Sequence, residues 1–98
     1  MTLSYKNKFN KKYGFDKDQA NSIKEIAKLS NIKYSNALKI VKKGEGAFYS
    51  NPQSVRKSVS SARQWGYSRL YSAVMGGKAA KIDKDLLKWN KLIIYYFI

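Results

Sequence analysis

The side chains that could do chemistry in this chain are mostly amines, guanidinium groups and phenols. Lys and Arg together number 20, Tyr numbers 8 and Asp plus Glu number 6 in 98 residues, while His and Cys are absent. Without His the usual general base and the commonest metal ligand are missing, and without Cys there is no thiolate nucleophile and no Cys-ligated metal centre. We therefore expect a protein that is not an enzyme, with no catalytic residues, metal site, cofactor or small-molecule substrate.

The basic charge is spread over the whole chain. Eleven Lys stand against four acids in residues 1–45, and nine Lys plus Arg stand against two acids in residues 46–98, which is +7 in each half and +14 in total. A surface of this kind attracts phosphate groups and acidic proteins. A hydrophobic content of 44% is too high for a disordered polycation, so we expect the chain to fold.

Two short helices are predicted in the first half of the chain. Ser22 and Glu25 have the spacing of a capping box, which predicts a helix start. Asn31 tolerates a positive φ and is expected to end this helix. A second helix is expected to cover about 34–43, and Gly44 is expected to stop it.

The second half is expected to hold a loop and two further helices. Residues 44–52 contain two glycines and an Asn-Pro pair, which predict an ordered loop. Ser61 and Gln64 repeat the capping-box spacing before a strongly apolar stretch that ends at a pair of glycines. Gly66 inside this predicted helix indicates the close approach of another backbone, and Asp83 is expected to cap a last helix.

These signals predict an all-α fold, a single small domain over residues 1–98 with four to five short helices. Its parts are expected to be a Lys- and aromatic-rich N-terminal arm or helix (1–15), a helical hairpin (22–43), and a loop plus two C-terminal helices (44–98). The chain ends in an apolar tail that could be helix or strand. No apolar run is long enough for a membrane span, which needs about 20 residues.

Small and apolar residues follow a defined spacing in the predicted hairpin. Ala27 follows an apolar residue, a turn residue stands four positions later, and Ile32, Ala37 and Ile40 come next. In this spacing the segment resembles a helix-turn-helix of the bacterial regulator type, which implies that the second helix enters a major groove. The alternative is a hairpin with only a structural role. The candidate nucleic-acid-binding residues are Lys33, Tyr34, Ser35, Asn36, Lys39, Lys42 and Lys43.

A second resemblance covers residues 44–87. This part of the chain contains GEGAFYSNPQSVR and, further on, QWGYSRLYSAVMGGKAAKIDKDLL. In the order of these residues it is similar to a small domain of unknown function found in proteins of large DNA viruses and tailed phages. The resemblance implies a virus-encoded protein, located in the virion or otherwise inside the host cell, and it implies no catalytic residues.

Arg69 is one of only three Arg in a chain dominated by Lys. Its planar guanidinium within an aromatic helix predicts a bidentate partner such as Asp83 or Asp85, and the alternative is phosphate recognition. With Trp65 and Tyr71, Arg69 is expected to form a buried structural cluster of aromatic rings around a guanidinium group.

Aromatic and apolar residues gather at both ends of the chain. The three N-terminal rings are spaced four residues apart and would share one face of a helix, and residues 92–98 form an unbroken apolar run. Each group could pack in the core of this domain or dock on a neighbouring subunit. The candidate docking residues are Tyr5, Phe9, Tyr13, Trp89, Tyr95, Tyr96 and Phe97.

Two functional hypotheses follow from these features. The first is a non-enzymatic structural protein of a virus, a minor capsid or capsid-associated component that binds acidic surfaces of other virion proteins and could also contact packaged DNA. The alternative is a helix-turn-helix DNA-binding protein. The viral resemblance and the apolar ends favour the first hypothesis.

Overall fold

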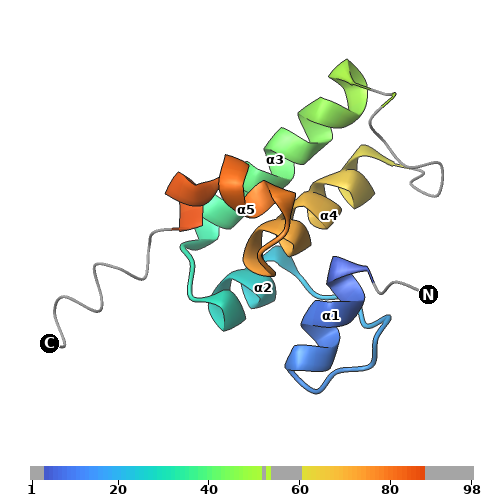
Figure 1. The fold of residues 1–98 in the computed structure, drawn as a ribbon, viewed down its shortest axis with the longest axis vertical. Coiled ribbons are helices and arrows are strands. Elements are labelled where there is room, and N and C mark those ends of the chain that lie inside the picture. Colours follow the sequence, from blue (N-terminus) through green and yellow to red (C-terminus); the bar gives the residue numbers. More distant parts are fainter. Residues whose placement is uncertain (1–3, 52, 54–60, 88–98) are drawn as a thin grey trace, which may run out of the picture.

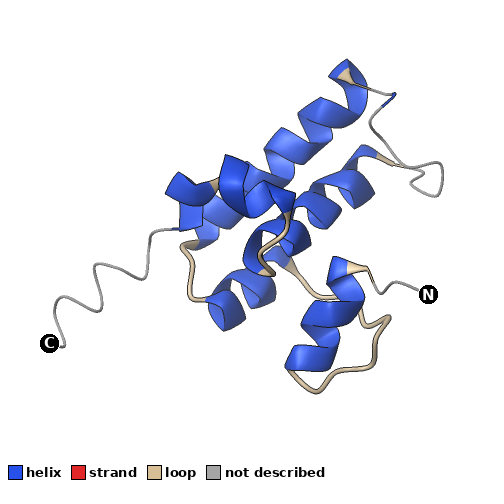
Figure 2. Ribbon diagram, in the orientation of Figure 1, coloured by secondary structure: helices blue, strands red, loops and turns tan. Residues whose placement is uncertain are grey.

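Helices make up most of the described chain, and α4 lies at their centre (Figure 1). The structure is a computed structural model that describes residues 4–51, 53 and 61–87. No strand occurs within these residues, which confirms the predicted all-α class (Figure 2). None of the described helices is both long enough and apolar enough to cross a membrane. The elements are α1 (Tyr5–Lys12), α2 (Ile23–Ser30), α3 (Tyr34–Ser50), α4 (Ala62–Val74), α5 (Lys78–Ile82) and the 3-10 turn η2 (Lys84–Leu87).

The central pair of helices, α3 and α4, run antiparallel and pack closely side by side (Figure 1). Their backbones meet where Gly44 faces Gly66. A Cβ added to Gly44 would lie 2.6 Å from the Gly66 Cα, and one added to Gly66 would lie 2.5 Å from the Val41 carbonyl oxygen. Only glycine fits at such distances, so the close backbone approach predicted at Gly66 is confirmed.

The remaining helices pack around this pair and complete one hydrophobic core. Its largest apolar side chains include Phe9, Ile26, Ile40 and Leu70, each with 0% of its surface exposed. The ring of Phe9 meets the ring of Tyr71 edge-on, with centroids 5.3 Å apart. Because this contact buries α1 against α4, α1 is part of the domain and not a free arm.

A buried polar network holds α1 and its connection to α2 against α4. The Asn21 side-chain amide donates to Asn10 Oδ1 at 2.6 Å and to the Tyr71 hydroxyl at 3.1 Å. The Asn10 amide donates in turn to the carbonyl oxygens of Lys17 and Gln19. Within the described residues every buried side-chain nitrogen and oxygen has a partner, so the network fixes the position of α1 without an unsatisfied group.

The helix starts predicted at Ser22 and Ser61 are confirmed. Each serine hydroxyl accepts a hydrogen bond of 3.1 Å from a backbone N–H three residues later, that of Glu25 or Gln64. Asn31 ends α2 in the left-handed conformation with φ 57°, also as predicted. Local signals of this kind succeed because they satisfy backbone groups that a helix end leaves unpaired.

The stop predicted at Gly44 is wrong, because α3 continues to Ser50. Residues 44–50, expected to begin an ordered loop, are the last turns of this helix. Glycine costs a helix about 1 kcal/mol relative to alanine, but here Gly44 allows α3 to pack on the α4 backbone. We infer that this packing outweighs the local preference. Pro52 lies outside the described residues.

The chain after α4 also differs from the expected pair of C-terminal helices. α4 ends at Val74, before the glycine pair as predicted, but the short helix α5 then follows and was not predicted. The last helix was expected to start at Asp83, and η2 does start directly after it, while the rest of the expected helix lies outside the described residues. Asp83 does not cap this turn with its side chain. It closes the end of α5, and its carboxylate pairs with Arg69 and Lys43. The apolar tail predicted in residues 92–98 lies outside the described part of the chain.

Candidate nucleic-acid interface

The candidate interface consists of α2, a three-residue turn and α3. The Asn31 backbone N–H donates to the carbonyl oxygens of Ala27 and Lys28, and the Ile32 N–H donates to the carbonyl oxygen of Ala27 at 3.0 Å. These bonds satisfy the last carbonyl groups of α2. They also fix the direction in which the chain enters α3.

One side of this hairpin is sealed in the core. Ile26 and Ala27 on α2, and Ala37, Ile40 and Val41 on α3, each expose 2% or less of their surface. Positions three or four residues apart lie on the same face of a helix. The opposite face of α3 must therefore point to solvent.

Several of the predicted contact residues are exposed on α3 or at its start. Ser35, Lys39 and Lys42 follow one another at helical spacing and are all exposed. Lys33 and Tyr34, at the start of the helix, are also exposed, and Tyr34 exposes 51% of its surface. Three of the seven predicted residues, Ser35, Lys39 and Lys42, thus form one exposed row along α3, and Lys33 and Tyr34 are exposed where the helix begins.

The other two predicted residues, Asn36 and Lys43, lie at the edges of this face. Asn36 is partly buried. The Lys43 ammonium lies 3.3 Å from Asp83 Oδ1, and it is therefore engaged within the protein. Because a buried carboxylate balances its charge, Lys43 is a weaker candidate for a phosphate contact than Lys39 or Lys42.

Asp83 ties α3 and α4 to the end of α5. Its carboxylate, with a side-chain exposure of 0%, accepts from Arg69 Nε at 2.8 Å and from Arg69 Nη2 at 3.0 Å, which confirms the predicted bidentate partner. Burial acts to raise the pKa of Asp83, but the hydrogen bonds and charges of Arg69 and then of Lys43 outweigh it and hold the pKa below its usual value. The carboxylate therefore stays ionised at neutral pH.

The predicted cluster of Trp65, Arg69 and Tyr71 does not form as one unit. Residues two positions apart on a helix point in different directions, and Tyr71 packs on Phe9 while Arg69 pairs with Asp83. Trp65, one turn before Arg69, lines the same surface cavity as Arg69. The structural role expected of Arg69 therefore belongs to its ion pair and not to an aromatic cage.

The N-terminal rings that were candidates for docking on a partner are largely used inside the domain. Phe9 has no exposed surface, and the Tyr13 hydroxyl donates to the Leu29 carbonyl oxygen at 2.9 Å. Docking through Phe9 is therefore wrong, because α1 packs this ring into its own core. Tyr5 keeps 37% of its surface exposed. The C-terminal candidates Trp89, Tyr95, Tyr96 and Phe97 lie outside the described residues.

Lysines on α1 and α2 adjoin the interface and were not among the predicted contact residues. Lys24 and Lys28 are exposed one turn apart on α2. Lys12 and residues of the α2–α3 turn line a cavity of about 230 Å³. The i, i+4 spacing of the α2 pair is a signal visible in the sequence. Lys12 lies near the turn because α1 packs beside the end of α2, where the Tyr13 hydroxyl donates to the Leu29 carbonyl oxygen, and the local sequence gives no signal for this contact.

Comparison with protein-family models, with curated proteins and with solved structures found no match for this chain.

Proposed function

We propose that this protein is a non-enzymatic basic domain that binds DNA through the solvent face of α3. The observation that carries this proposal is the division of α3 into two faces. Ala37 and Ile40 on the inner face are completely buried, whereas Lys39 and Lys42 on the outer face are exposed and pair with no acid among the described residues. Ammonium groups on a rigid helix, with no acid to neutralise them, attract DNA phosphates.

The residues on this face differ in what they can contact. Lys39 and Lys42 have long cationic side chains suited to phosphate oxygens, which position a protein on the duplex. Ser35 and Asn36 are short and polar, so they can reach base edges only if the first turns of α3 enter the major groove. Lys33 is the residue just before the first turn of α3, so it would approach base edges from the same end of the helix as Ser35 and Asn36.

Replacing both Lys39 and Lys42 with Gln is expected to weaken binding to duplex DNA and to flatten its salt dependence. Each phosphate contact adds about 0.9 to the magnitude of the negative slope of log K against log salt concentration. In the double variant the magnitude of this slope should therefore fall by about 1.8. The measurement is the fluorescence anisotropy of a labelled duplex at several salt concentrations.

The matched control is the double variant Lys17→Gln with Lys81→Gln. It removes the same charge from two exposed residues on other parts of the surface. Its salt slope should stay close to that of the unaltered protein. Equal losses in the two double variants would show that only net charge matters, and the assignment to α3 would then be wrong.

Base reading by the start of α3 has a separate test. A groove reader holds its preferred sequence at least about 10³ times more tightly than random DNA. The double variant Lys33→Ala with Asn36→Ala should reduce this ratio for a sequence selected from a random pool. An unchanged ratio would refute base recognition by these two residues.

A second candidate function, a virus-encoded component of the virion, is favoured by the exposed apolar side chains. Tyr49 exposes 76% of its surface and Ile82 exposes 67%, so both are available to a protein partner. The viral resemblance of residues 44–87 supports the same proposal, in which packaged DNA is the ligand of α3. Quantitative proteomics of purified particles should then find many copies per particle, and absence from the particles would contradict it. DNA binding is proposed first because Phe9, one of the rings expected to dock on a neighbouring subunit, is buried in the core of this domain.

A further inference from the structure

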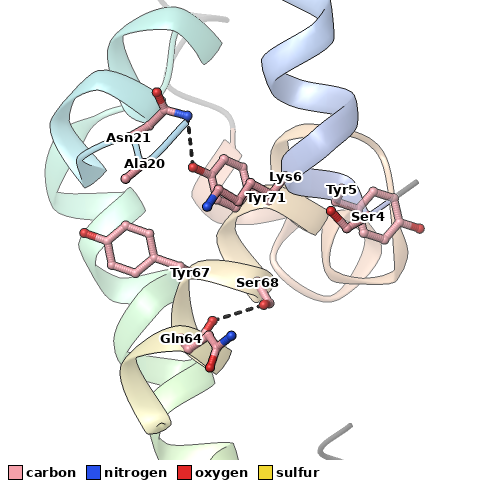
Figure 3. Close-up of a pocket in the computed structure, with 9 residues that line it drawn as sticks. All are labelled: Ser4, Tyr5, Lys6, Ala20, Asn21, Gln64, Tyr67, Ser68 and Tyr71. Atoms are coloured by element: carbon pink, nitrogen blue, oxygen red, sulfur yellow. Dashed lines mark hydrogen bonds between the residues drawn. The ribbon is translucent and has the colours of Figure 1, made fainter. Parts of the chain in front are cut away.

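A cavity of about 450 Å³ lies between the start of α1, the end of the connection from α1 to α2, and α4 (Figure 3). Its volume falls within the range of roughly 300–1,000 Å³ that is typical of small-molecule sites. The phenol rings of Tyr67 and Tyr71 line it together with Lys6 and Asn21, and Tyr5 lies at its edge with its ring turned away (Figure 3). None of these residues belongs to the DNA-binding face of α3.

The cavity carries positive charge. Lys6 is the one charged residue that lines it, and Lys6 forms no ion pair within the described part of the chain. A further cation lies beside the aromatic wall, with Arg63 Cζ 5.3 Å from the centre of the Tyr67 ring. A ligand with an anionic group is therefore favoured over a neutral or cationic one.

The Tyr71 hydroxyl supplies a hydrogen-bond donor at the cavity wall. Tyr71 is 3% exposed, and its oxygen accepts from the Asn21 amide at 3.1 Å (dashed in Figure 3). Among the described residues no acceptor takes the proton of this hydroxyl. Burial raises the pKa of Tyr71, so the hydroxyl keeps this proton at neutral pH. A ligand oxygen or ring nitrogen in the cavity would satisfy it.

The aromatic walls point to a planar ligand. Tyr67 projects from α4 one turn before Tyr71, and both rings stand at the cavity (Figure 3). Tyrosine rings stack on nucleobases of any kind because every base has a π-face. A cationic amine, aromatic walls and a buried hydroxyl donor together match a phosphate joined to a heteroaromatic base.

We propose that this cavity binds a nucleoside monophosphate unit, with its phosphate at Lys6 and its base against Tyr67 within reach of the Tyr71 hydroxyl. A free nucleotide and an unpaired nucleotide of a single strand present this same chemistry. The site is separate from the duplex-binding face, so either proposal can fail without the other.

AMP titrated into the isotope-labelled full chain is expected to shift the backbone amide resonances of Lys6 and Tyr67. Lys6→Gln should raise the dissociation constant of AMP, measured by calorimetry, at least about tenfold, because one charge-assisted phosphate contact is lost. The matched control is Lys11→Gln, an exposed lysine of the same helix outside the cavity, which should leave the affinity unchanged. Ala20→Trp fills the cavity from an exposed position and should abolish binding while circular dichroism remains that of a folded protein.

Three further ligands and one variant complete the test. Adenosine and inorganic phosphate should each bind far more weakly than AMP, and adenosine binding as tightly as AMP would overturn the assignment of Lys6. Equal effects of Lys6→Gln and Lys11→Gln would overturn the cavity as the site. If a short oligo(dA) strand displaces AMP, the ligand of the cavity is an unpaired nucleotide of a single strand. If the strand does not displace AMP, the ligand is a free nucleotide. The Lys39 and Lys42 double variant should bind AMP normally, which separates this site from duplex binding.

Discussion

Asp83→Asn is expected to lower the free energy of unfolding by about 3–5 kcal/mol, the usual cost of removing one partner from a buried ion pair. The Asp83 carboxylate is fully buried and accepts both hydrogen bonds of the Arg69 guanidinium as well as one from Lys43. Asn keeps the shape of the side chain but leaves Arg69, with 21% of its side chain exposed, without a counter-ion. Urea denaturation followed by circular dichroism measures the loss.

The effect of this substitution should depend on pH. In the folded protein the pKa of Asp83 is lowered, because Arg69 and Lys43 outweigh the opposing effect of burial. Its contribution to stability is therefore fully present above about pH 4, the pKa of an aspartate in an unfolded chain, and is lost as the pH falls through the lower pKa of the folded state. The difference in stability between the unaltered protein and Asp83→Asn should be largest near neutral pH and should shrink in acid.

The matched control for Asp83 is Asp16→Asn. Asp16 is exposed in the connection between α1 and α2, so the same change of charge should alter stability by no more than about 0.5 kcal/mol. Similar losses in the two variants would contradict a structural role for the Asp83 ion pair. A loss at Asp83 that is independent of pH would show that its charge is not what stabilises the fold.

The parts of the fold that could be predicted are those set by neighbours along the chain. Ser22 and Ser61 cap their helices through amides three residues away, and Asn31 ends α2 through its own tolerance of a positive φ. In each case the physical cause lies within one helical turn. The pattern of residues is then enough to predict the element.

The end of α3 could not be predicted, because its cause lies on another helix. Taken alone, Gly44 is a helix terminator, but in the fold it faces Gly66, which is 22 positions further along the chain (66 − 44). The backbone approach at Gly66 was predicted without its partner. Only the contact between Gly44 and Gly66 would predict that α3 continues through Gly44.

The candidate site shows the same division between local and tertiary causes. The exposed positions of Lys39 and Lys42 follow from the helical spacing of the buried residues Ala37, Ile40 and Val41, and they could be predicted. The ion pair of Lys43 could not be predicted, because its partner Asp83 lies 40 positions further along the chain. The nucleotide cavity was missed for a similar reason, since α1 and α4 must pack together before Lys6 and Tyr67 share a wall.

Gly44→Ala is expected to lower the free energy of unfolding by about 3 kcal/mol, at the upper end for overpacking. The new Cβ would lie 2.6 Å from the Gly66 Cα, and a backbone atom within a helix cannot rotate away as a side chain can. α3 and α4 would have to separate along the line where they pack most closely. The loss of that packing outweighs the gain of about 1 kcal/mol that alanine gives to a helix. Chemical denaturation measures the difference.

Gly46→Ala is the matched control for Gly44→Ala, because it is expected to change stability in the opposite direction. Gly46 lies on α3 two residues after Gly44, and a Cβ at Gly46 meets nothing within 4 Å. With no clash, the helix preference for alanine acts alone, and the variant should be more stable by up to about 1 kcal/mol. Gly66→Ala should resemble Gly44→Ala, because its Cβ would lie 2.5 Å from the Val41 carbonyl oxygen. If Gly44→Ala and Gly46→Ala shift stability in the same direction, the two helices do not meet through their backbones at this point.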